Sequence, residues 1–92
     1  MITLESLNLF FLLSYLIIVM TEEELLKKIG QRIKELRREK GMPQIELAVE
    51  LNYEKSNMSR LESGRVNPRI TTLFKVAKAL DVDLQELINI TK

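Results

Sequence analysis

The sequence predicts an all-α, five-helix domain at residues 21–92, preceded by an apolar N-terminal extension at residues 1–20. Apolar residues after residue 20 recur at spacings of three and four, and short loops separate the segments that carry them. No segment alternates apolar and polar residues as a half-buried strand does. About seventy residues can bury one modest core, and a domain this small often gains stability by pairing with itself.

The first predicted helix begins after Thr21. Thr21 and Glu24 have the spacing of a capping box, and acidic residues in a first turn are stabilised by the helix dipole. A basic segment and Gly41 mark the end of this helix. Its apolar stripe consists of Leu25, Ile29, Ile33 and Leu36.

Residues 44–63 predict two short helices that cross at a steep angle. Ala48 is small where a larger side chain would hold the two helices apart. Asn52 can adopt the left-handed conformation that a sharp turn between them requires. This spacing is typical of a helix-turn-helix. The residues that can turn inward are Leu47, Leu51, Tyr53, Met58 and Leu61.

The second of these two helices has an outer face that suits DNA. At about 100° per residue, its core side carries Met58 and Leu61. Lysine and arginine donate to guanine in the major groove, and serine is small enough to allow close approach. Periodicity alone is equally compatible with a solvated amphipathic helix. The outward residues are Lys55, Ser56, Ser59 and Arg60.

Two further helices complete the predicted domain. The fourth has inward-facing residues at helical spacing, and the fifth opens with a capping box formed by Asp83 and Glu86. The inward residues of the fourth helix are Leu73, Val76, Ala77 and Leu80, and those of the fifth are Leu84, Leu87 and Ile88.

Positive charge is concentrated in the second half of the chain. The net charge is only +1, yet residues 55–78 contain a single acid, Glu62, among the basic residues Lys55, Arg60, Arg65, Arg69, Lys75 and Lys78. Such a local concentration of cations is what phosphate binding requires. The charge distribution therefore favours double-stranded DNA as the partner.

Residues 44–63, followed by Gly64 and Asn67-Pro68, resemble the DNA-binding domain of lambda-repressor-like, Cro/cI-type regulators, also called the xenobiotic-response-element family. The resemblance covers residues 25–90, and its most specific parts are Gln-x-x-Leu-Ala and Ser-Arg-Leu-Glu-Ser-Gly. It implies a sequence-specific transcriptional regulator, in the first instance a repressor, that binds a two-fold symmetric operator as a homodimer.

The resemblance also implies individual roles. Gln44, Asn57 and Arg65 are expected at the DNA backbone, and Arg69 at the minor groove. The base-reading residues are expected to be Lys55, Ser56, Ser59 and Arg60. Three positions depart from the family pattern: Asn52 replaces a turn glycine, and Pro43 and Glu54 stand where a Ser or Thr cap is commoner.

Glu62 requires a cation. It lies at the margin of the predicted core, where an unpaired carboxylate is costly to desolvate, and on a helix that must approach phosphates. The resemblance implies Arg37 as its partner. We expect an Arg37–Glu62 ion pair that holds the third helix against the first, with Arg37 oriented toward the DNA backbone.

The composition argues against an enzyme. The chain has no Cys and no His, so the commoner nucleophiles, bases and metal ligands are missing. The adjacent carboxylates Glu22, Glu23 and Glu24 are better explained by a helix N-terminus than by a metal site. We expect no cofactor and no metal, and the lack of cysteine is compatible with the cytoplasm.

Residues 7–20 are uncharged and apolar. Three interpretations are open. Met20 is the natural start and the preceding residues are an upstream extension, or the segment packs on a partner subunit, or it anchors the protein in a membrane. The membrane anchor is the least favoured, because the apolar run is shorter than the ~20 residues that a span needs.

Two other functions are compatible with the same residues. An antitoxin would use this domain to bind both its operator and a toxin protein. Alternatively, an interaction module would retain the fold and use the apolar N-terminus to bind protein or membrane. A pure protein-binding module would have no reason to keep a basic outer face.

Overall fold

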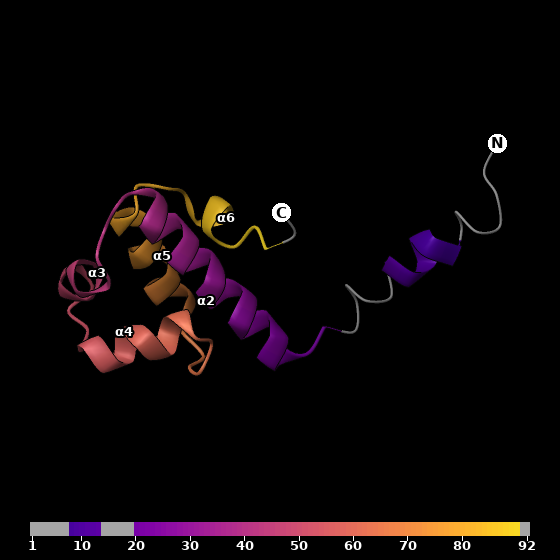
Figure 1. The fold of residues 1–92 in the computed structure, drawn as a ribbon, viewed down its shortest axis with the longest axis horizontal. Coiled ribbons are helices and arrows are strands. Elements are labelled where there is room, and N and C mark those ends of the chain that lie inside the picture. The colour runs from indigo at the N-terminus through magenta and orange to yellow at the C-terminus, as the bar shows by residue number, and fades with distance from the viewer. Residues whose placement is uncertain (1–7, 14–19, 91–92) are drawn as a thin grey trace.

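The computed structural model describes residues 8–13 and 20–90 (Figure 1). Residues 8–13 form a short helix. The predictions that concern residues 1–7 and 14–19, which include most of the apolar extension, lie outside the described residues, as do residues 91 and 92. The predicted boundary at residue 20 therefore remains a prediction.

The described part of residues 20–90 is helical and contains no strand, which confirms the predicted all-α class. In Figure 1, α2 crosses the domain diagonally, with α3 and α4 on one side of it and α6 on the other. The helices are α2 (Glu22–Glu39), α3 (Gln44–Glu50), α4 (Lys55–Glu62), α5 (Ile70–Ala79) and α6 (Leu84–Leu87). The five-helix prediction for the domain is confirmed.

The helix ends follow the local sequence. The Thr21 hydroxyl accepts a hydrogen bond from the Glu24 amide at 3.1 Å, and the Asp83 carboxylate accepts one from the Glu86 amide at 2.7 Å. Both are N-cap contacts of the predicted capping boxes. The N-caps of α3 and α4 are Pro43 and Glu54, which make no side-chain capping bond.

Asn52 makes the predicted turn between α3 and α4. Its φ angle is +55°, in the left-handed region, and the following Tyr53 amide donates to the Ala48 carbonyl oxygen at 2.8 Å. Asparagine tolerates this conformation better than most residues with a side chain. Asn52 therefore makes the turn at the position where the resembled family usually has glycine.

A single core joins the five helices of the domain. Its buried members, which include most of the predicted inward residues, are Ile29, Ile33, Leu36, Leu47, Ala48, Met58, Leu61, Leu73, Val76, Ala77, Leu80 and Leu87. Leu51, Tyr53 and Leu84 pack at its edge.

Two predicted core residues, Leu25 and Ile88, were assigned wrongly, since their exposed fractions are 38% and 40%. Leu25 precedes the part of α2 that is closely approached, where Gly64 lies against Lys27 and α4 lies against Gly30. Ile88 follows Leu87, the last residue of α6.

Gly30 sets the close approach of α2 and α4. A Cβ atom on Gly30 would lie 2.5 Å from the Glu62 carbonyl oxygen and 2.6 Å from that of Leu61. Real Cβ atoms do not approach backbone this closely, so any side chain here would push α4 away from α2. Nothing in the helical periodicity indicated this role.

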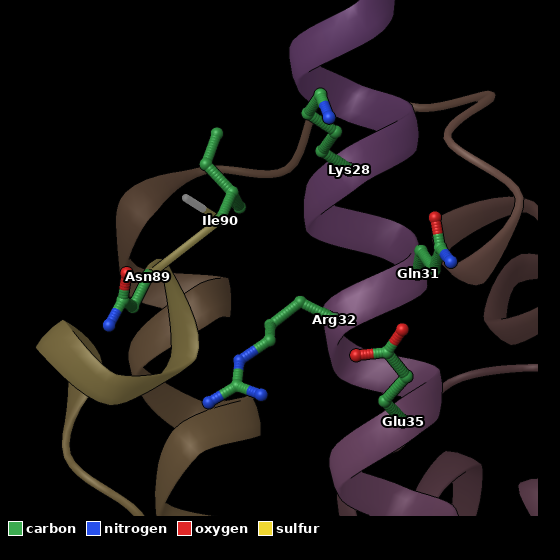
Figure 2. Close-up of a pocket in the computed structure, with 6 residues that line it drawn as sticks. All are labelled: Lys28, Gln31, Arg32, Glu35, Asn89 and Ile90. Atoms are coloured by element: carbon green, nitrogen blue, oxygen red, sulfur yellow. The ribbon is translucent and has the colours of Figure 1, made fainter. Parts of the chain in front are cut away.

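An ion pair between Arg32 and Glu86 attaches α6 to α2. The Arg32 Nη2 atom lies 2.7 Å from Glu86 Oε1, and the same guanidinium donates to the Glu86 carbonyl oxygen at 3.3 Å. Figure 2 shows Arg32 directed toward α6 at the edge of a polar pocket of about 220 Å³. The sequence did not predict this contact, because a separation of 54 residues leaves no local pattern.

Candidate nucleic-acid interface

The outer face of α4 carries the residues predicted to read bases. Lys55, Ser56, Ser59 and Arg60 are all exposed, whereas Met58 and Leu61 are buried in the core. The exposed and buried faces of α4 therefore agree with those predicted from 100° per residue. The result is a short helix that exposes two cations and two small hydroxyl groups.

The loop after α4 extends this cationic surface. Arg65 and Arg69 are both exposed. The loop is closed by the Arg65 amide, which donates to the Arg60 carbonyl oxygen at 2.9 Å, and by Gly64, whose φ angle is +76°. The hydrogen bond and the positive φ angle form a Schellman-type helix end, which turns the chain directly after α4.

Asn57 and Arg69 lie around the same surface depression, although they are separated in sequence. The depression is about 330 Å³ and is formed by α4, the following loop and the start of α5. It is lined by Tyr53, Asn57, Val66, Asn67, Pro68, Arg69 and Thr72. A predicted backbone contact and the predicted minor-groove arginine are thus neighbours.

Lys75 and Lys78 line a different surface depression. With Glu50, Leu51, Asn52 and Ala79 they line a separate depression between the end of α3 and the end of α5. The Lys78 ammonium also lies over the Phe74 ring, 5.4 Å from its centre. The basic stretch of residues 55–78 is therefore divided, and its members on α4 and in the following loop are Lys55, Arg60, Arg65 and Arg69.

The structure contains the expected Arg37–Glu62 ion pair. Arg37 Nε lies 2.6 Å from Glu62 Oε2, and Arg37 Nη2 donates to Glu62 Oε1 at 3.1 Å. This is a two-point contact between planar groups, the strongest common form of ion pair. The two side chains are only 9% and 3% exposed, so the pair is buried between α2 and α4.

The Arg37 guanidinium is buried and hydrogen-bonded within the protein, which limits its access to a DNA phosphate. Besides its two bonds to Glu62, its Nη1 atom donates to the Met42 carbonyl oxygen at 2.7 Å. All three guanidinium nitrogens therefore have protein partners. We assign Arg37 to holding α4 against α2, and its contact with the DNA backbone remains a prediction.

Gln44 links the buried pair to the surface. Its Nε2 atom donates to Glu62 Oε1 at 3.0 Å, and its Oε1 atom accepts a hydrogen bond from the Ser59 hydroxyl at 3.0 Å. Gln44 is the first residue of α3, and Ser59 and Glu62 are on α4. Each of these residues was predicted to have a role, but the hydrogen bonds of Gln44 to Glu62 and Ser59 were not predicted.

No helix within residues 8–13 and 20–90 is long and apolar enough to cross a membrane. The same residues contain no group of three or more acidic side chains placed to hold a metal ion.

Comparison with known proteins supports this geometry. A family model described as helix-turn-helix matches residues 33–87. An uncharacterised HTH-type transcriptional regulator, y4dJ of Sinorhizobium fredii, is 40% identical over 65 residues, which are 71% of this chain and 84% of y4dJ. The immunity repressor protein of Bacillus phage phi105 is 37% identical over 60 residues, which are 65% of this chain but only 42% of the phage protein.

One solved structure shows a similar protein on DNA. It is the crystal structure of SinR, a master regulator for biofilm formation, in complex with DNA. The match has a TM-score of 0.60 and 44% sequence identity, and it covers 66% of this chain and 98% of the SinR chain in that structure. The likeness therefore extends to both sequence and fold.

Proposed function

Because the chain belongs to the helix-turn-helix family of lambda-repressor-like, Cro/cI-type DNA-binding regulators, we propose that it is a transcriptional repressor that binds a two-fold symmetric operator as a homodimer. The observation that carries the proposal is the outer face of α4, where Lys55, Ser56, Ser59 and Arg60 are exposed together. A similar domain is seen with DNA in the SinR complex, and the phage relative is named as a repressor.

In this proposal α4 enters the major groove and its surroundings hold the phosphates. Lys55 and Arg60 are long enough to donate to guanine O6 and N7, and the two serines allow close approach. Gln44, Asn57 and Arg65 contact the DNA backbone, and Arg69 reaches the minor groove. Occupation of a promoter by such a dimer is sufficient for repression. Since the protein must share a compartment with its operator, we propose a cytoplasmic location.

A selection of bound sequences from random duplexes tests the proposal. A helix-turn-helix dimer inserts its two recognition helices one turn of B-DNA apart, about 34 Å. We expect the selected sequences to contain inverted half-sites whose centres are about 10 base pairs apart, or a multiple of that. Failure to enrich any sequence would contradict sequence-specific binding, and a single unpaired half-site would contradict the homodimer.

Alanine at Lys55 or Arg60 is expected to weaken binding to the selected operator by about 1 to 3 kcal/mol and to widen the range of tolerated bases. The physical reason is the loss of a base-edge donor rather than of a phosphate contact. Binding of labelled operator and of labelled random duplex, measured by fluorescence anisotropy, separates the two effects.

Arg65→Ala is the matched control for these variants. Arg65 is an exposed arginine beside α4, but we assign it to phosphate, so its loss should weaken the operator and the random duplex by similar factors. If Lys55→Ala and Arg60→Ala also reduce both affinities equally, these residues do not read bases.

One observation favours a second function, that of an interaction module. The described helix of residues 8–13 exposes large apolar side chains: Leu9, Phe10, Phe11, Leu12 and Leu13 are each more than half exposed. Exposed apolar surface of this kind often marks a contact with protein or membrane. This function would be favoured if DNA affinity were weak and independent of salt, since phosphate contacts make binding fall steeply as salt rises.

A further inference from the structure

A chain of hydrogen bonds runs from the buried core to the outer face of α4. It begins at Glu62, whose side chain is only 3% exposed. The Glu62 carboxylate accepts from Arg37 Nε and Nη2 and from Gln44 Nε2. A carboxylate that is paired with a guanidinium has no hydrogen to donate. The Gln44 amide must therefore direct its NH₂ group, not its oxygen, toward Glu62.

This orientation determines what Gln44 presents at its other end. With its nitrogen directed at Glu62, its Oε1 atom faces the Ser59 hydroxyl, 3.0 Å away. An amide oxygen only accepts hydrogen bonds, so Ser59 must donate its single hydroxyl hydrogen to Gln44. On its exposed side, Ser59 Oγ can therefore accept a hydrogen bond but has no hydrogen left to donate.

We infer that Ser59 reads DNA as a hydrogen-bond acceptor, and that Glu62 and Gln44 are the positioning residues that impose this direction. The inference rests on the proposed function. In the major groove, the amino groups of adenine N6 and cytosine N4 are donors, whereas guanine O6 and N7 and thymine O4 are acceptors. The base that Ser59 reaches is therefore adenine or cytosine on the strand that faces it.

Ser56 provides an internal comparison. It is also an exposed serine on α4, but within the described residues its hydroxyl makes no hydrogen bond to Gln44 or to any other side chain. A hydroxyl that is free to rotate can donate or accept, so it cannot distinguish amino bases from keto bases. The two serines should thus differ in specificity although they are chemically identical.

The test is base preference, measured by sequence selection on the full chain for the wild type and for Ser59→Ala, Gln44→Met and Ser56→Ala. In the wild type, one operator position should favour adenine or cytosine over guanine or thymine by about 2- to 10-fold, the value of one net hydrogen bond. Ser59→Ala should abolish this preference. Gln44→Met should abolish it too, because the Ser59 hydrogen is then free to donate, and Ser56→Ala should retain it.

The outcomes separate this inference from the function on which it rests. A preference that survives in Gln44→Met, or a Ser59-dependent position that favours guanine or thymine, would overturn the inference while leaving operator binding intact. No enriched sequence with the wild type would instead overturn the proposed function itself. If Gln44→Met lowers the melting temperature too far for selection, Ser59→Ala decides alone, because it alters an exposed side chain by one oxygen atom.

Discussion

Replacing Glu62 by Gln is expected to lower the free energy of unfolding by about 3 to 5 kcal/mol, because it leaves the guanidinium of Arg37 buried without its counter-charge. Arg37→Met should cost a similar amount for the converse reason. A domain of this size is stable by only about 5 to 15 kcal/mol, so either variant is close to the threshold of unfolding. Urea denaturation followed by circular dichroism measures the effect.

The double variant decides whether the two side chains act as a pair. With both charges removed neither partner is stranded, so the combined loss should be smaller than the sum of the two single losses. Glu23→Gln is the control, because the Glu23–Lys27 pair, at 3.5 Å, is mostly exposed and should contribute less than about 1 kcal/mol. Additive losses in the double variant would show that the pair does not couple α2 to α4.

Gly64→Ala is expected to cost about 2 to 5 kcal/mol, from two separate causes. The φ angle of +76° is unfavourable for a residue with a Cβ atom by about 1 to 2 kcal/mol. In addition, that Cβ atom would lie 2.6 Å from the Lys27 Cα atom, and crowding against backbone adds about 1 to 3 kcal/mol. Thermal unfolding of the variant should show a correspondingly lower melting temperature.

Gly41→Ala isolates the first cause. Gly41 also follows a helix and has a φ angle of +66°, but a Cβ atom there would meet nothing within 4 Å. Its loss should therefore be limited to the conformational cost of about 1 to 2 kcal/mol. Equal losses at Gly41 and Gly64 would mean that the close approach of the Gly64 loop to α2 contributes nothing.

The helix ends and the faces of the helices could be predicted from sequence because they depend on residues a few positions apart. The N-cap contacts of Thr21 and Asp83 span three residues, and the turn at Asn52 follows from the conformational freedom of one residue. The exposed face of α4 follows from a period of 3.6. Arg37 was identified as the partner of Glu62 by resemblance to a family, since 25 residues separate the two.

The contacts between residues on different helices could be known only from the tertiary structure. It showed that Gly30 is needed where α2 meets α4, that Arg32 binds Glu86 across 54 residues, and that Lys75 and Lys78 line a depression with the end of α3. It also showed that Gln44 joins Glu62 to Ser59, so that a buried carboxylate determines the direction of a surface hydroxyl. Hydrogen-bond direction depends on which atoms are within about 3 Å of each other, and helical periodicity carries no information about partners on other helices.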